Sequence, residues 1–209
     1  MKNIQSDIQI FDEDSILEGA FTVAVTDIFT LTAHSFRIGD VIHVATDNAL
    51  PAGLVASTNY YVVGPITTNT FKVSASQGGP AVDVTDTGTG TQTLDLKGRV
   101  IYTGDHTTVN IMFNFASTPT MTLKVQGSSK LDTPDFYAAQ STTNRWDYME
   151  IVDLEDGTII DGDTGIACSG SADNRIIQVN TNGLSWVTLA VTAWTAGKLG
   201  AYATLYDNN

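Results

Sequence analysis

The stretch "LPAGLVASTNYYVVGPITTNTFKVSAS", residues 50–76, shows the pattern that decides the fold class. Within it, "NYYVVG" (59–64) and "NTFKVSA" (69–75) are rich in β-branched and aromatic residues, and their apolar residues alternate with polar ones. Such alternation is typical of half-buried strands. Turn-forming residues separate them, and Pro51 and Gly53 are expected to fix a turn before the first strand. The stretch therefore predicts strands joined by turns, with no obvious catalytic group.

The same alternation extends in both directions and predicts a small all-β module over residues 20–96. Turn residues separate its segments, and nothing in it has the period of a long helix. We expect about five strands, at "FTVAVTDIFTL" (21–31), "DVIHVA" (40–45), 59–64, 69–75 and "TQTLDL" (91–96).

From Lys97 onward the predicted strands become longer, which is typical of a β-sandwich or jelly roll. This second domain covers residues 97–209, and a short helix is possible over 135–140. In "TMTLKVQGS" (120–128), Met121, Leu123 and Val125 are expected on one face. The other strands are predicted at 98–104, 109–116, 145–155, 174–180, 184–194 and 197–207.

The first 19 residues do not fit the small module, because "SDIQIFDE" (6–13) reads as a separate strand. Two interpretations remain open. This segment is either the first strand of the sandwich, which makes residues 20–96 an insertion, or an arm that reaches a neighbouring subunit. The candidate interface residues are Ile8, Ile10 and Phe11 here, and Tyr60 and Tyr61, which must point to opposite faces of their strand.

Charge excludes some functions, because the net charge is −13. The segment before Lys97 contains three basic and eleven acidic residues, and the segment from Lys97 onward contains seven basic and twelve acidic residues. Such a field repels phosphate backbones, so we expect no nucleic-acid partner. No apolar run approaches the length of a membrane span, so we also expect no membrane partner. The N-terminus lacks the apolar core of a signal peptide, which predicts synthesis in the cytoplasm without export.

The small module resembles one that recurs in virion proteins of tailed bacteriophages. The resemblance covers roughly residues 21–94 and depends on the order and spacing of five elements: "TAHSFRIGD" (Thr32–Asp40), "LPAGL" (Leu50–Leu54), "YYVV" (Tyr60–Val63), "TFKVSAS" (Thr70–Ser76) and "GTGT" (Gly88–Thr91). The later segments 120–136 and 196–209 look similar to β-sandwich proteins that coat phage heads or tails.

The resemblance implies a structural virion protein, most simply a capsid decoration (cement) protein that binds the assembled head. Its partners would be the major capsid protein or other virion proteins, and the resemblance favours a homo-oligomer, in particular a trimer. A tail-tube or other tail protein is the first alternative. A glycan-binding module on the virion surface is the second, and it would use exposed aromatic residues.

No catalytic constellation is apparent, so we expect no enzyme activity and no cofactor. Cys168 is the single cysteine and is interpreted as a small buried residue. Asp156, Asp161 and Asp163 are a weak candidate for a calcium site, although their Asp-Gly pairs are also strong turn formers. Alternation places Trp146, Trp186 and Trp194 in strands, and we expect them in the sandwich core.

Overall fold

The computed structural model describes residues 4–170 and 174–207, and every regular element within these ranges is a strand. The predicted all-β class is therefore confirmed. The chain divides into two compact units: a barrel unit, Ser15–Lys97, and a sandwich unit, which joins Met1–Asp14 to Gly98–Asn209. The described ranges contain no helix long and apolar enough to cross a membrane.

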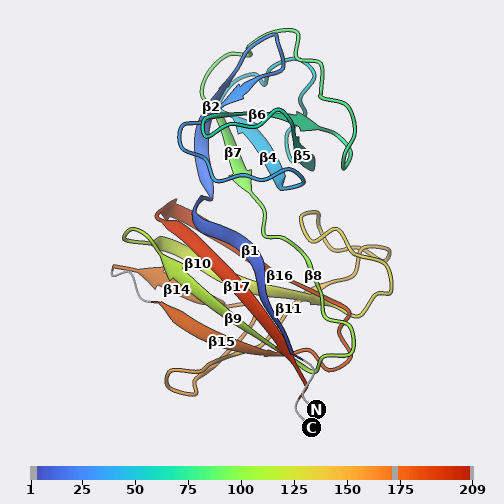
Figure 1. Cartoon of the computed structure of the whole chain (residues 1–209), viewed down its shortest axis with the longest axis vertical. Helices are drawn as coiled ribbons and strands as arrows, with labels where there is room; N and C mark the ends of the chain where they lie inside the picture. Colours follow the sequence, from blue (N-terminus) through green and yellow to red (C-terminus); the bar gives the residue numbers. More distant parts are fainter. Residues whose placement is uncertain (1–3, 171–173, 208–209) are drawn as a thin grey trace. The chain divides into compact units, whose positions relative to one another are not determined.

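Two sheets build the sandwich unit (Figure 1). The six-stranded sheet consists, in spatial order, of β1 (Ile4–Ile16), β17 (Lys198–Tyr206), β9 (Thr108–Phe115), β15 (Arg175–Asn180), β12 (Ile151–Asp153) and β13 (Ile159–Ile160). The five-stranded sheet consists of β11 (Asp147–Tyr148), β10 (Thr120–Ser128), β16 (Trp186–Ala196) and β8 (Ile101–Tyr102), with β14 (Ile166–Ser169) also paired to β10.

The core of the sandwich unit follows the alternation of its strands. Val109, Ile111 and Phe113 of β9 are fully buried, whereas the residues between them are partly or largely exposed. In β10, Met121, Leu123 and Val125 are buried on one face, as predicted. Successive side chains of a strand point to opposite faces, so this pattern fixes which side of each sheet packs inward.

The barrel unit is a closed barrel of six short strands. Closure pairs the first strand with the last, so none of the six is left as an open edge. In spatial order the strands are β2 (Glu18–Val23), β3 (Phe29–Thr30), β6 (Thr70–Ser74), β5 (Tyr60–Val63), β4 (Val41–Thr46) and β7 (Gln92–Leu96).

Aromatic rings fill the centre of the barrel unit. The Phe29 ring centroid lies 5.2 Å from that of Phe21 and 5.4 Å from that of Phe71. His34 joins this cluster, because its imidazole stacks on Phe36 at 4.9 Å and meets Phe71 edge-on at 5.0 Å. His34 therefore places a titratable imidazole among the phenylalanine rings of the barrel interior.

The sequence predictions for 21–31, 135–140 and 145–155 are wrong in detail; the last of these forms two short strands, β11 and β12, which belong to different sheets. The single strand predicted over 21–31 is a hairpin, in which Ala24 N–H donates to the Ile28 carbonyl. Asp27 takes a positive φ of 63° in the turn, a conformation that aspartate tolerates better than most residues. The short helix over 135–140 is absent, because the Asn144 side chain bonds both the N–H and the carbonyl of Asp135.

The N-terminal strand belongs to the chain's own sheet. β1 lies beside β17 at the edge of the six-stranded sheet (Figure 1). The barrel unit therefore falls between β1 and β8 in sequence order, and its limits at Ser15 and Lys97 lie slightly outside the predicted 20–96.

Candidate functional site

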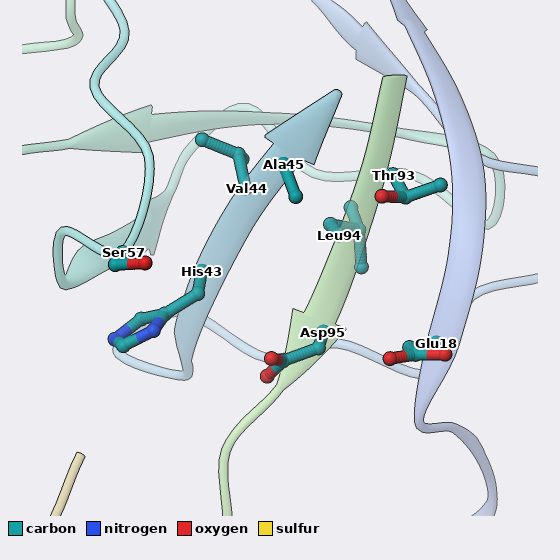
Figure 2. Close-up of a pocket in the computed structure, with 8 residues that line it drawn as sticks. All are labelled: Glu18, His43, Val44, Ala45, Ser57, Thr93, Leu94 and Asp95. Carbon is teal, nitrogen blue, oxygen red and sulfur yellow. The ribbon is translucent and has the colours of Figure 1, made fainter. Parts of the chain in front are cut away.

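A small, solvent-open hollow of about 110 Å³ lies on the barrel unit, across the neighbouring strands β2, β7 and β4. The hollow is a candidate site because binding and catalytic residues usually lie in clefts that gather titratable groups. Figure 2 shows its lining, which consists of Glu18 from β2, His43, Val44 and Ala45 from β4, Thr93, Leu94 and Asp95 from β7, and Ser57 from the loop before β5.

Strand register places three titratable residues of the hollow in one row. Asp95 of β7 pairs with Glu18 on one side and with His43 on the other. Lys97 Nζ lies 2.8 Å from Asp95 Oδ1 and compensates its charge. The pKa of Glu18 is raised, first because partial burial disfavours its charged form and second because Asp95 lies opposite, while Lys97 acts in the other direction. The row thus contains two carboxyl groups and one imidazole, and Lys97 compensates the charge of Asp95.

Ser57, His43 and Asp95 are the residue types of a hydrolytic triad, but His43 Nε2 bonds a residue outside this set. His43 Nε2 lies 2.6 Å from Asn59 Oδ1. Figure 2 shows the His43 ring extending away from Asp95. A general base must reach the nucleophile's proton at about 2.6–3.2 Å and be oriented by a third group. The hollow therefore offers hydrogen-bonding groups, and one nitrogen of its imidazole is bonded to Asn59.

The acidic loop over residues 153–165 uses its carboxylates to cap turns. Asp156 Oδ1 accepts the N–H of Thr158 at 2.8 Å, and Asp161 Oδ1 accepts the N–H of Asp163 at 2.9 Å. The bond from Thr158 is the main cause of the lowered pKa of Asp156. Among the described residues, no three His, Cys, Asp or Glu side chains gather as metal ligands. The structure does not bring Asp156, Asp161 and Asp163 together as a metal-ligating group.

The three tryptophans lie at the periphery of the sandwich unit, so their predicted core position is wrong. Each is half-buried, and each indole N–H donates to a backbone carbonyl: Trp146 to Ala138, Trp186 to Lys130 and Trp194 to Gly197. Aliphatic and phenylalanine side chains fill the space between the sheets. An indole N–H that is shielded from water needs a hydrogen-bond acceptor, and backbone carbonyls supply one for each tryptophan here.

Trp186 forms an exposed aromatic pair with Tyr102. The two residues face each other across β16 and β8, with ring centroids 4.8 Å apart and planes inclined by 54°. Tyr102 is 60% exposed. A Cβ placed on Gly104 would lie 3.5 Å from the Tyr102 ring, so the chain passes close beside that ring. Sequence reasoning missed Tyr102, because only its alternation with Ile101 marks it as outward-facing.

The five predicted interface candidates divide into core and surface residues. Ile10 and Phe11 are each 1% exposed and lie inside the sandwich unit, while Ile8 is half-buried. Tyr60 is also in a core, and its hydroxyl accepts the N–H of Val55. Tyr61 is half-buried and points to the opposite face. Ile10, Phe11 and Tyr60 therefore fill the interior of their own chain and present no surface to another subunit.

Comparison with known proteins adds little to this geometry. No protein-family model and no curated protein matches the chain. A solved structure with some similarity is that of YomS, a protein derived from the SPBc2 prophage. It is 12% identical with a TM-score of 0.39, and the similarity covers 53% of this chain and 80% of that one. Similarity at this level assigns neither a family nor a function.

Proposed function

We propose that this chain is a structural component of a tailed-bacteriophage virion, specifically a capsid decoration protein that binds the assembled head. One observation carries the proposal. The five elements that resemble a phage virion module, spread over residues 21–94, lie within a single structural unit, Ser15–Lys97. The resemblance thus corresponds to one complete folded unit, as expected if a whole module is shared.

Each of the five elements has an identifiable place in the barrel unit. "YYVV" forms β5, "TFKVSAS" contains β6, and "TAHSFRIGD" leads into β4. In "LPAGL", Gly53 lies so close to the Asp83 carbonyl that a Cβ would be 2.3 Å from it. In "GTGT", a Cβ on Gly88 would be 2.5 Å from the Ala49 carbonyl. The two glycine turns therefore pack against other loops of the same unit, which supports interpreting the five elements as one module.

The proposed mechanism is mechanical, and we propose no enzymatic step. Many copies, made in the host cytoplasm, bind where capsid subunits meet and bury additional surface there. A protein that binds only the assembled shell stabilises that shell by mass action. The net charge of −13 favours docking to basic patches of the major capsid protein.

The test is co-sedimentation of the purified chain with undecorated phage heads. We expect the chain to pellet with heads, to stay in solution with unassembled capsid protein, and to raise the temperature at which heads release DNA. Binding should weaken with added salt, because exposed charges are screened. Heads that leave all of the chain in solution would contradict the proposal, and binding to purified tails alone would favour the tail alternative.

A second candidate function, glycan binding, is favoured by the exposed pair of Tyr102 and Trp186. Sugar rings stack on aromatic faces, and a chain of charge −13 suits neutral sugars better than anionic ones. Trp186 provides a fluorescence signal for titration with neutral oligosaccharides. Saturable quenching of the Trp186 fluorescence would support this function if Tyr102→Ala abolishes it. Leu131→Ala is the control and should preserve the quenching, because Leu131 is also exposed in the sandwich unit. A signal unchanged at millimolar sugar would exclude it.

A further inference from the structure

The outer face of the six-stranded sheet has an uncharged centre. On this face, residues paired across β17, β9 and β15 form rows that point away from the core. Between Gly200 and Tyr206 of β17, the described residues of these rows include no charged residue. The central row consists of Tyr202, Met112 and Ile176. Next to Ile176 lies Leu154, whose N–H donates to the Ile176 carbonyl. The other rows contain Gly200 and Asn114; Thr204, Asn110, Gln178, Val152 and Ile159; and Tyr206, Thr108 and Asn180. Within them, Gly200 and Thr108 are buried.

The exposed apolar area of this face is concentrated in a few residues. Met112 is 50% exposed, Ile176 44% and Ile159 64%. Charged groups lie at the margin: Lys198 begins β17, and the Glu13 backbone lies beside Gly200. The chain has 10 basic and 23 acidic residues, so an uncharged sheet face is unusual for it. An apolar centre with a polar rim is the usual anatomy of a protein interface.

We propose that this face packs against the same face of a second copy of the chain. Two chains of charge −13 repel each other, and the repulsion is smallest where the apposed surfaces carry no charge. A surface that contacts its own equivalent forms a closed pair with two-fold symmetry. Two sheets stacked face to face lie about 10 Å apart, so the central rows of both copies would interdigitate. This pair replaces the trimer that the phage resemblance favours.

The size of the face suits a weak, reversible pair. Three strands about 4.8 Å apart, each with about four outward residues spaced by about 6.8 Å, give roughly 400 Å² per copy. The pair would bury about 800 Å² in total, which is below the roughly 1,000 Å² expected of a specific, stable interface. Association should therefore depend on concentration. The inference does not rest on the proposed virion function.

Sedimentation equilibrium of the full chain tests the pair directly. We expect the mass to rise from 22.3 kDa towards twice that value as the protein concentration is increased. Met112→Lys should keep the chain monomeric, whereas Leu131→Lys, on an exposed residue outside the sheets, should not. Added salt should strengthen the pair, because screening reduces repulsion between the acidic chains. A wild-type chain that stays monomeric, forms a trimer, or pairs equally well with Lys at position 112 would overturn the proposal.

A second measurement does not depend on the folding of a variant. Methyl NMR of ¹³C-methionine-labelled chain should show a concentration-dependent shift of the Met112 signal, with the buried Met121 signal unchanged. The variant Met112→Leu assigns the signal. A shift at Met121 alone, or no shift at either residue, would contradict pairing through this face.

Discussion

Arg99 and Asp12 form a bidentate ion pair within the sandwich unit, with Nη1 3.2 Å from Oδ1 and Nη2 3.1 Å from Oδ2. The backbone N–H of Arg99 also donates to the Ile10 carbonyl. The chain leaves the sandwich unit after Asp14 and returns to it at Gly98. The ion pair therefore lies next to both crossing points and fixes the two ends of the barrel insertion close together.

Replacing Asp12 with Asn should destabilise the sandwich unit by about 1–3 kcal/mol, because the mostly buried guanidinium of Arg99 loses its carboxylate partner. Arg99→Lys keeps the charge but loses the two-pronged geometry, so a smaller loss is expected. All three tryptophans belong to the sandwich unit, so their fluorescence in a urea titration reports its unfolding. An unchanged midpoint and slope for Asp12→Asn would show that the pair contributes nothing.

Replacing residues 15–97 with a short Gly/Ser linker should leave a folded sandwich. The expectation follows from the ion pair, since insertions require ends that lie close together. Tryptophan fluorescence and dispersed amide NMR signals would confirm a packed core. The same deletion with Asp12→Asn provides the matched control and should be less stable. An insoluble or unfolded product in both cases would mean that the two units fold only as one.

Gly53→Ala should destabilise the barrel unit by more than about 2 kcal/mol, because φ is +100° and the new Cβ would lie 2.3 Å from the Asp83 carbonyl. Gly39→Ala is the matched control, with φ of +95° and no atom near the new Cβ. Gly39→Ala should lower the free energy of unfolding by only about 1 kcal/mol, the cost of placing alanine at a positive φ. Hydrogen exchange of β5 and β6 amides measures both losses. Equal losses would show that the contact with Asp83 is unimportant.

The barrel unit should lose stability as the pH falls below about 6.5. Burial among phenylalanines lowers the pKa of His34, with an opposing contribution from the Thr70 backbone, and the Phe36 N–H donates to His34 Nδ1. The unfolded chain then binds a proton at about pH 6.5 that the folded chain takes up only at lower pH. The contribution of His34 to the free energy of unfolding is therefore fully present above about pH 6.5. It is lost as the pH falls from there towards the lower pKa of the folded chain. Hydrogen exchange between about pH 7.5 and 5.5 should detect the loss. His34→Gln should remove this component, and an identical slope in that variant would contradict the assignment.

Alternation identified most strands, because one residue in two must face a core. β10 has the predicted limits, 120–128, and its three inward residues are the predicted ones. The barrel closure was not predictable in the same way, since the pairing of β2 with β7 joins residues far apart in sequence. The hairpin at Asp27 was missed because its turn contains no glycine or proline.

The candidate site was less predictable than the fold. Glu18, Asp95 and His43 form a row only through the register of three strands, and no local pattern links them. The same holds for Tyr102 and Trp186, which meet across two strands. The acidic loop was visible in the sequence, but its hydrogen bonds agree with the turn interpretation of its Asp-Gly pairs.

The proposed virion function is tested most directly by gold-labelled antibody against this chain, applied to purified virions and viewed by electron microscopy. The control is the same antibody after absorption with the purified chain. A decoration protein should give label over the heads, at many positions on each particle. Virions without label, although the chain is present in the infected cell, would contradict a structural role in the particle, and label confined to tails would contradict the decoration of heads.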